Sequence, residues 1–337
     1  MSHQDDSALK SIFGDAGFGT SGLMGSAITN SGRIKLLESV FDSGVTHFDT
    51  APLYGMGQAE NVLGSFAKNK RDQITIASKY GLLPPRVPLY LQPLVPIARQ
   101  LSRRSHALRQ ISSRILKRHQ ATGDETPKNN RGSGLTDQVS PPVFNTENIN
   151  KSLHQSLNKL NTPYLDLFLM HDCAADQITD ELIDCLTSLV HQGKICRFGF
   201  SIFRQELVRV QNKLRDIDCV MQFQHDIRSD TLAQKETSRA ITYGALLSVL
   251  PSIMLHLESE AINERWRSDL SLDCLGTDEV VGYLLHGALQ SSNGACMLFS
   301  SRDSLRARQT LNVLRSVPSD PARLTRFKYL VLNEVKF

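Results

Sequence analysis

The chain has 337 residues, of which 40% are hydrophobic and 21% are charged, and its formal net charge is +4. This composition is typical of a globular protein, and the length suits one large α/β barrel or two ordinary domains. The polar start MSHQDDSALK lacks the basic and apolar parts of a secretory signal, and no run of eighteen apolar residues indicates a membrane span. The six cysteines lie without CxxC pairs or metal-ligand spacing, so we expect reduced thiols, no metal site and a cytoplasmic protein with no membrane partner.

Short apolar runs alternate with amphipathic stretches along the chain. After a glycine-rich run around residues 17–20, strands are predicted at residues 45–48, 73–78, 165–170, 195–201, 219–223, 240–246 and 295–300. Helices are predicted at residues 33–41 and 59–66, from 146, at 180–191, near 205–213, within 278–290 and from 303. About eight strand–helix units indicate a closed parallel barrel or a doubly wound sheet, and the lack of a GxGxxG turn before the first helix favours the (β/α)8 TIM barrel.

Residues 84–144 form an insert after the third predicted strand, far longer than an ordinary strand-to-helix loop. The insert holds ten basic and three acidic residues. A solvated basic helix packed on the barrel, a lid and a cofactor clamp all fit this charge, whereas the lack of interleaved aromatic residues argues against nucleic-acid binding. We expect a single domain, residues 1–337. Strand-to-helix loops lie at the catalytic face of a barrel, so we expect the insert over or beside that face.

Four chemically distinct side chains follow the ends of three predicted strands. Asp49 and Tyr54 lie in HFDTAPLYG. Lys79 ends the later run ITIASK, and His171 ends LDLFLMH. The C-terminal strand ends of a parallel barrel form its active site. Each residue alone also has a structural interpretation, as a turn cap, an interfacial ring, a surface lysine or a satisfied polar group, but their order and common placement favour catalysis.

These residue types suit proton transfer coupled to hydride transfer. Reducing a carbonyl builds negative charge on its oxygen, which a nearby donor must quench. Tyr54 is the predicted donor, and the Lys79 ammonium is expected to lower the phenol pKa from its usual value of about 10. Asp49 would hold the lysine charged and oriented, and His171 would align the substrate oxygen.

The motifs DTAPLYG, SKYG, DLFLMHD, GKICRFGFS and MQFQ together resemble the aldo/keto reductase family over residues 17–314. The resemblance implies a (β/α)8 barrel that interconverts a small-molecule alcohol and carbonyl with NAD(P)(H). The pattern is most similar to the branch containing sugar 1-dehydrogenases and pyridoxal dehydrogenase. A non-catalytic barrel that binds cofactor and regulates a partner is the alternative, and the intact set of four side chains argues against it. The substrate, the direction of the reaction and the oligomeric state stay open.

The same resemblance implies where a nicotinamide would bind. Gln222 would contact the carboxamide, Tyr243 would stack on the ring, and Ser201 stands where the family has a serine doing similar work. The residue after this serine is commonly asparagine in the family but is Ile202 here, which removes one amide contact.

The segment CMLFSSRDSLRARQTL resembles the part of the family that holds the cofactor phosphate. Hydroxyls, backbone N–H groups at a helix start and a basic side chain suit this task. The candidates are Ser300, Ser301 and Arg306, with Arg302 and Arg308 as nearby options. An arginine here favours a 2′-phosphate and hence NADP(H) over NAD(H). A basic first helical turn with a serine N-cap is the structural alternative.

Overall fold

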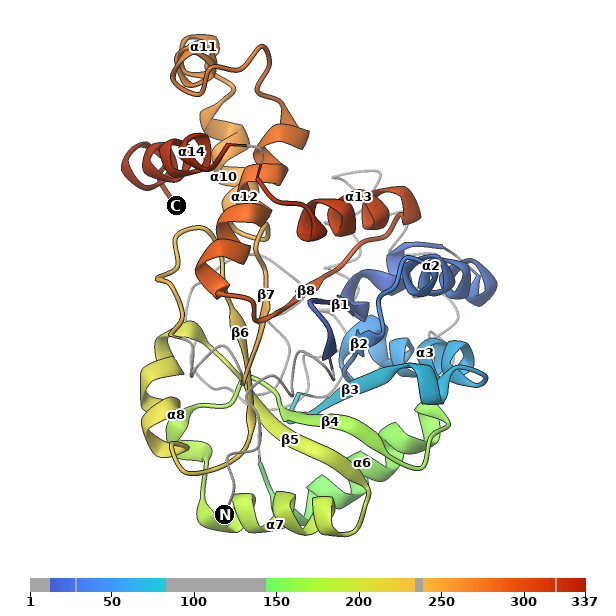
Figure 1. Ribbon diagram of the computed structural model, residues 1–337. Helices are drawn as coiled ribbons and strands as arrows, with labels where there is room; N and C mark the ends of the chain where they lie inside the picture. The colour runs from blue at the N-terminus through green and yellow to red at the C-terminus, as the bar shows by residue number, and fades with distance from the viewer. Residues whose placement is uncertain (1–12, 28, 83–143, 234–238, 319) are drawn as a thin grey trace, which may run out of the picture.

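The eight strands of the computed structural model are all parallel and form a closed barrel in the order β1-β2-β3-β4-β5-β6-β7-β8 (Figure 1). The structure describes residues 13–27, 29–82, 144–233, 239–318 and 320–337. The predicted (β/α)8 fold is therefore confirmed. All of the predicted insert except its last residue, Phe144, lies outside the described residues, as does its expected position beside the catalytic face.

The strands lie close to their predicted positions. They are β1 (Ala16–Gly19), β2 (His47–Asp49), β3 (Thr75–Tyr80), β4 (Leu165–Met170), β5 (Ile195–Ile202), β6 (Val220–Gln224), β7 (Ala240–Tyr243) and β8 (Cys296–Phe299). Strand β7 is shorter than the predicted residues 240–246. It ends because Gly244 has a φ of +80°, and a Cβ at this position would lie only 3.0 Å from Cγ of Gln224.

Four of the described helices around the barrel begin at a capping side chain, which is Thr29, Asn145, Thr179 or Asp303. The helices around the barrel are α2 (Asn30–Asp42), α3 (Ala59–Ala67), α6 (Thr146–Leu160), α7 (Asp180–His191), α8 (Leu207–Lys213), α12 (Thr277–Ser292) and α13 (Ser304–Arg315). Thr179, for example, accepts a hydrogen bond from the backbone N–H of Leu182 at the start of α7. Short 3-10 turns complete the loops: η1 (Thr20–Gly25), η2 (Tyr54–Gly57), η3 (Arg71–Gln73), η6 (Ala175–Gln177) and η7 (Arg204–Glu206).

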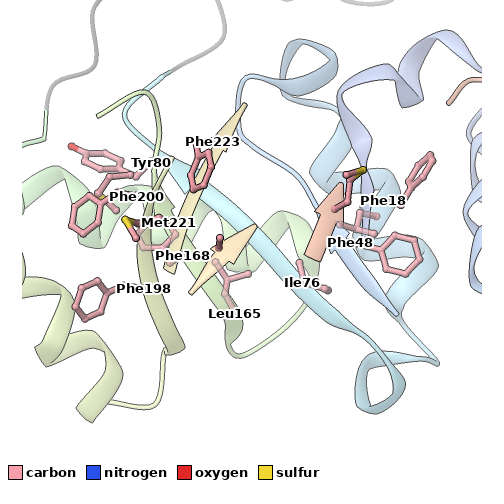
Figure 2. Packing of buried hydrophobic residues seen from close by; sticks show 14 of the residues in the cluster. Phe18, Phe48, Ile76, Tyr80, Leu165, Phe168, Phe198, Phe200, Met221 and Phe223 are labelled. Carbon is pink, nitrogen blue, oxygen red and sulfur yellow. The ribbon is translucent and has the colours of Figure 1, made fainter. Parts of the chain in front are cut away.

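Side chains on each strand alternate between the barrel interior and the surrounding helices. One buried cluster contains the interior residues Ala77, Leu167, Leu169, Val220, Ile241 and Leu298. The larger cluster contains the helix-facing residues, among them Phe18, Phe48, Ile76, Phe168, Phe200 and Phe223 (Figure 2). Because the alternation has a period of two, polar residues two positions after an interior residue also point into the barrel.

Three helices that the sequence did not predict pack beside the barrel. They are α10 (Val249–His256), α11 (Glu260–Asp269) and α14 (Pro321–Glu334), which lie together with the first half of α12 at one side of the molecule (Figure 1). We call these four helices the helical unit. Its core holds the fully buried Trp266, and the rings of Tyr283 and Phe327 stack with centroids 4.7 Å apart. Helix α12 joins both cores, since Leu284 packs in the helical unit and Leu285 packs in the barrel.

The lowered pKa values of three buried histidines predict how the free energy of unfolding depends on pH. Burial lowers the pKa of His47 and His225 to about 4 and that of His171 to about 3, because the interior disfavours the charged imidazolium. In the unfolded chain each pKa returns to about 6.5. Below pH 6.5 the unfolded state therefore binds more protons than the folded state. Stability is fully present above pH 6.5 and should fall by roughly 1 to 3 kcal/mol for each histidine as the pH approaches 4.

Urea unfolding between pH 7 and pH 4.5 measures this effect. As the pH falls, the free energy of unfolding of the variant His225→Gln should decrease less steeply than that of the parent. The difference between the two slopes should correspond to about one bound proton. The matched variant His154→Gln replaces an exposed histidine and should keep the parent slope. The same slope for both variants would contradict the assignment of His225 as a buried neutral group.

Candidate active site

The predicted site residues lie at one end of the barrel, in or directly after five different strands. Asp49 ends β2, Lys79 is the penultimate residue of β3, and His171 directly follows β4. Gln222 lies in β6 and Tyr243 ends β7. Lys79 and Gln222 each stand two positions after an interior residue, Ala77 and Val220, so the strand alternation directs both into the barrel.

The Asp49 carboxylate joins two of these side chains. One carboxylate oxygen, Oδ1, accepts a hydrogen bond from Nζ of Lys79, and Oδ2 accepts one from Nε2 of Gln222 at 2.9 Å. Nζ of Lys79 also donates to the carbonyl oxygen of Thr50 at 3.1 Å. Asp49 is 2% exposed and Lys79 is 1% exposed. A buried ammonium with a carboxylate partner stays charged, so Lys79 is a fixed positive charge inside the barrel.

Tyr54 lies between the lysine and the histidine. Its ring centroid is 5.0 Å from Nζ of Lys79 and 6.0 Å from the centroid of the His171 ring, to which it is nearly perpendicular. The next residue, Gly55, has a φ of +61°, and a Cβ there would lie 2.1 Å from Cγ of Met24. Glycine is therefore required for the turn that carries the phenol past η1.

The expectation that Lys79 lowers the pKa of Tyr54 is wrong for this structure. Burial, and then the carboxylates of Asp49 and Asp172, raise the pKa of Tyr54 well above its ordinary value of 10. The physical reason is that the buried phenolate would lose its hydration, and that the Asp49 carboxylate paired with Lys79 also acts on the phenol. Tyr54 is consequently protonated at neutral pH and can act as a proton donor.

His171 is a neutral hydrogen-bonding group. Burial, and then the positive charge of Lys79, lower the pKa of His171 to about 3. Its backbone N–H donates to the carbonyl oxygen of Tyr80 at 2.7 Å, which ties the end of β4 to the end of β3. Within the described ranges, Nδ1 of the ring is buried without a hydrogen-bond partner. A neutral imidazole beside the phenol can hydrogen-bond an oxygen of a bound molecule.

The candidate nicotinamide residues lie around the same strand ends. Ser201 is buried on β5, and its carbonyl oxygen accepts a hydrogen bond from the backbone N–H of Cys173 at 2.9 Å. Ile202 packs in the helix-facing core, so this position contributes to packing. Burial, Asp172 and Tyr54 raise the pKa of Tyr243 to about 12, so its ring is a neutral, flat surface beside Tyr54.

The candidate phosphate segment lies between β8 and the start of α13. A Cβ on Gly22 of η1 would lie 3.0 Å from Oγ of Ser300, so η1 borders this segment closely. Ser301 Oγ donates to the carbonyl oxygen of Asp303 at 2.8 Å, and the Asp303 carboxylate accepts the backbone N–H of Arg306 at 2.9 Å. Asp303 is thus the N-cap, in place of the serine that the structural alternative proposed. The Arg306 side chain is exposed.

Two carboxylates near the site were missed in the sequence. Asp172 stands directly after His171 in DLFLMHD, and Asp303 stands between Ser301 and the start of α13. Both were visible as acidic residues inside motifs already singled out. What the sequence did not reveal is the left-handed backbone of Asp172, with a φ of 52°, and the capping role of Asp303.

Neither a metal centre nor a bilayer span is found in the parts of the chain that the structure describes. Over these ranges, no three His, Cys, Asp or Glu side chains gather as metal ligands would. Likewise, every described helix is too short or too polar to traverse a lipid bilayer.

Comparisons with known proteins agree with this architecture. A model of the aldo/keto reductase family matches residues 15–237. Pyridoxal 4-dehydrogenase from Microbacterium luteolum is 24% identical over 237 residues, which cover 65% of this chain and 61% of that protein. D-threo-aldose 1-dehydrogenase from a Pseudomonas species is 38% identical over 58 residues, which cover 17% of this chain and 18% of that protein.

A solved structure shares the fold. An aldo-keto reductase from Bacillus halodurans, in its holo form, has a TM-score of 0.63 and 17% identity, with 94% of this chain and 91% of that chain covered. The chain spans 61% of the length of the pyridoxal 4-dehydrogenase that it matches. The family model covers more than half of the chain, and the resemblance expected from the motifs is confirmed: the chain belongs to the aldo/keto reductase family.

Proposed function

We propose that this protein is an NAD(P)(H)-dependent oxidoreductase that interconverts an alcohol and a carbonyl, where the carbonyl is an aldehyde, a ketone or a sugar hemiacetal. The observation that carries the proposal is the position of the protonated Tyr54 phenol between the Lys79 ammonium and the neutral His171 ring. We also propose that residues 1–337 act as one domain around this site.

In the proposed mechanism, each side chain has one task. The cofactor, when bound, supplies or accepts the hydride. Tyr54 donates its hydroxyl proton to the carbonyl oxygen as negative charge develops there, and in the oxidative direction its phenolate accepts the proton back. The Lys79 ammonium, held by Asp49, lies over the Tyr54 ring with Nζ 5.0 Å from the ring centroid and helps to position the phenol. His171 hydrogen-bonds the substrate oxygen and keeps it within reach of the phenol.

The residues present fit a nicotinamide cofactor. Ser201 and Gln222 place a hydroxyl and an amide at the barrel mouth, and the Tyr243 ring offers a flat surface beside them. Ser300, Ser301 and Arg306 would hold the phosphate end. We propose NADP(H) over NAD(H), because Arg302, Arg306 and Arg308 outnumber the single acidic residue Asp303 in this segment.

A fluorescence titration with NADPH and NADH, each added separately, tests the proposal. We expect saturable binding of at least one cofactor. A screen of aldehydes and sugars with whichever cofactor binds should then show turnover. Saturable binding without turnover on any carbonyl or alcohol would instead support the non-catalytic barrel.

The proposed phosphate role of Arg306 predicts a difference between the two cofactors. Arg306→Ala should weaken NADPH binding by about 1.5 to 3 kcal/mol more than NADH binding, because only NADPH carries the 2′-phosphate. Dissociation constants from the fluorescence titration measure the difference. Arg315→Ala, roughly 14 Å further along the same helix, contacts the carbonyls of Ser43 and Gly44 and should change neither constant.

Two outcomes would revise this assignment. Equal losses for NADPH and NADH in Arg306→Ala would refute the phosphate role. If Arg302→Ala produced the differential loss instead, the phosphate contact would lie on the loop before α13 while the preference for NADPH remained.

A further inference from the structure

A buried arginine lies in the first turn of helix α2. Arg33 is 3% exposed, and it shares one helix face with Leu36, Leu37 and Val40, which pack in the barrel core. Its Nη1 donates a hydrogen bond to Oδ1 of Asn30 at 2.6 Å, so the guanidinium reaches back to the N-terminal end of the helix. The first turn of this described helix holds no acidic side chain that would pair with the guanidinium.

The other edge of the Arg33 guanidinium has no partner. Nε and Nη2 are buried, and no described residue accepts a hydrogen bond from either nitrogen. Burial lowers the pKa of Arg33, and no carboxylate in the described part of the chain offsets this effect. An arginine nevertheless keeps its charge in a protein, so loss of a proton does not relieve the burial. A buried positive charge without a counter-ion is costly, and an anion that pairs with it reduces the cost.

The geometry of the free edge indicates which anion would bind. Nε–H and one Nη2–H of a guanidinium point in parallel, and this arrangement binds two oxygens of one carboxylate or phosphate. The first N–H groups of a helix also lack partners within the helix, and its dipole favours negative charge there. Thr29 Oγ1 accepts one of them, the N–H of Gly32, at 3.2 Å. The guanidinium edge and the helix start therefore offer hydrogen-bond donors at the same turn.

This turn stands at the same end of the barrel as the candidate active site. Helix α2 begins five positions after η1 ends, and η1 directly follows β1 (Figure 1). The 3-10 turn η1 contacts both parts of the site. A Cβ on Gly22 would lie 3.0 Å from Oγ of Ser300, and a Cβ on Gly55, beside Tyr54, would lie 2.1 Å from Cγ of Met24. Because helices of this fold start at the catalytic face, the free edge of Arg33 belongs to that face.

We propose that the first turn of α2 is an oxyanion site in which Arg33 binds a phosphate-sized anion through Nε and Nη2. Because solvent does not reach these nitrogens, the ligand is a small ion or a single phosphoryl group rather than a whole organic molecule. Entry requires a local opening at the start of the helix, and helix ends fray. Two sources have this chemistry: free inorganic phosphate, and a phosphoryl group that NADPH and NADH share. Only the second source rests on the proposed oxidoreductase function.

Thermal unfolding in phosphate and in chloride at equal ionic strength tests the site without any turnover. The unfolding midpoint of the parent should rise with phosphate in a saturable way. We expect a rise of about 2 to 4 °C when phosphate exceeds its dissociation constant about tenfold. Arg33→Met removes the charge and should lose most of this phosphate-specific rise. In chloride alone the midpoint of Arg33→Met should equal or exceed that of the parent, because the uncompensated buried charge is gone.

Two further variants control for charge and for folding. Lys35→Met removes an exposed positive charge from the same helix and should keep the phosphate response of the parent. Arg33→Lys keeps a positive charge but lacks the edge with two nitrogens, so its dissociation constant for phosphate should rise about tenfold. It also provides the comparison if Arg33→Met does not fold. The same phosphate response in the parent and in both Arg33 variants would overturn the inference.

A fluorescence titration with NADH separates the two sources, because NADH carries no 2′-phosphate for the Arg306 segment. If the anion is a phosphoryl group of the cofactor, phosphate should compete with NADH, and Arg33→Lys should weaken NADH binding about tenfold. If the anion is free phosphate, it should bind alongside NADH and leave the dissociation constant unchanged.

The remaining outcomes distinguish this inference from the proposed function. A parent that binds neither NADPH nor NADH, yet is stabilised by phosphate through Arg33, refutes the proposed function and supports the oxyanion site. A parent whose unfolding midpoint rises no more in phosphate than in chloride, and whose NADH binding does not depend on Arg33, overturns the oxyanion site and leaves the proposed function intact.

Discussion

Replacing Tyr54 by phenylalanine should lower turnover by about 10²- to 10⁴-fold, the usual contribution of a positioned proton donor. The substitution removes only the hydroxyl, so the ring still occupies the space between Lys79 and His171. Cofactor dissociation constants should therefore remain within about twofold of the parent, because the loss is confined to the transition state. Steady-state turnover and the fluorescence titration measure the two quantities on the same preparation.

Tyr80 provides the matched control for this substitution. It is the neighbour of Lys79 on β3, but it faces the helices, and its hydroxyl donates to the carbonyl oxygen of Asn145 at 3.1 Å. Tyr80→Phe should cost about 1 kcal/mol of stability and leave turnover nearly unchanged. Turnover of Tyr54→Phe within tenfold of the parent would exclude the phenol as the main donor.

Replacing Lys79 by methionine should have the largest effect on stability. The substitution leaves the Asp49 carboxylate buried with Gln222 as its remaining side-chain donor. Breaking a buried ion pair by removing one partner costs about 3 to 5 kcal/mol, because the other charge stays in the interior without compensation. Urea unfolding measures the change, and turnover should be lost together with the fixed positive charge beside Tyr54.

A double variant separates the two consequences of losing Lys79. Asp49→Asn combined with Lys79→Met removes both charges, so much of the lost stability should return while turnover stays absent. The control is Arg209→Ala, which breaks the exposed pair with Glu206 and should cost less than about 1 kcal/mol. If the double variant were no more stable than Lys79→Met, the loss of stability in Lys79→Met would not come from the uncompensated Asp49 charge.

The barrel could be predicted because its elements carry local signals. The predicted bounds of β4 and α7 agree with the structure, since an apolar run defines the first, and Thr179, Asp180 and Gly193 mark the ends of the second. Helix α14 carried such a signal and was overlooked, since Asp320 caps it, Pro321 begins it, and Leu324, Phe327 and Val331 recur at helical spacing. Helices α10 and α11 have no such signal. In α11 Trp266 is the one fully buried residue of the described helix, so its apolar face is defined by packing against α14. These helices are stabilised by packing contacts between segments far apart in sequence, which a local pattern does not reveal.

The candidate site was predictable to a similar extent. The order of the residue types along the chain and their placement at predicted strand ends were sufficient to propose Asp49, Tyr54, Lys79 and His171. The C-terminal strand ends of a parallel barrel lie together at one mouth. The direction of the Tyr54 pKa shift was not predictable, since it depends on burial and on two carboxylates. The hydrogen bond from Gln222 to Asp49 joins residues 173 positions apart and required the closed barrel to be seen.

Helix α12 connects the barrel and the helical unit without a flexible joint. Leu284 and Leu285 are neighbours in one continuous helix, yet each belongs to a different core. Rotation of one core relative to the other would require the helix itself to bend. This stiffness extends to the barrel seam, because α12 leads directly into β8, whose residue Phe299 pairs with Phe18 of β1. Helix α12 therefore links the core of the helical unit to the strand that closes the barrel against β1.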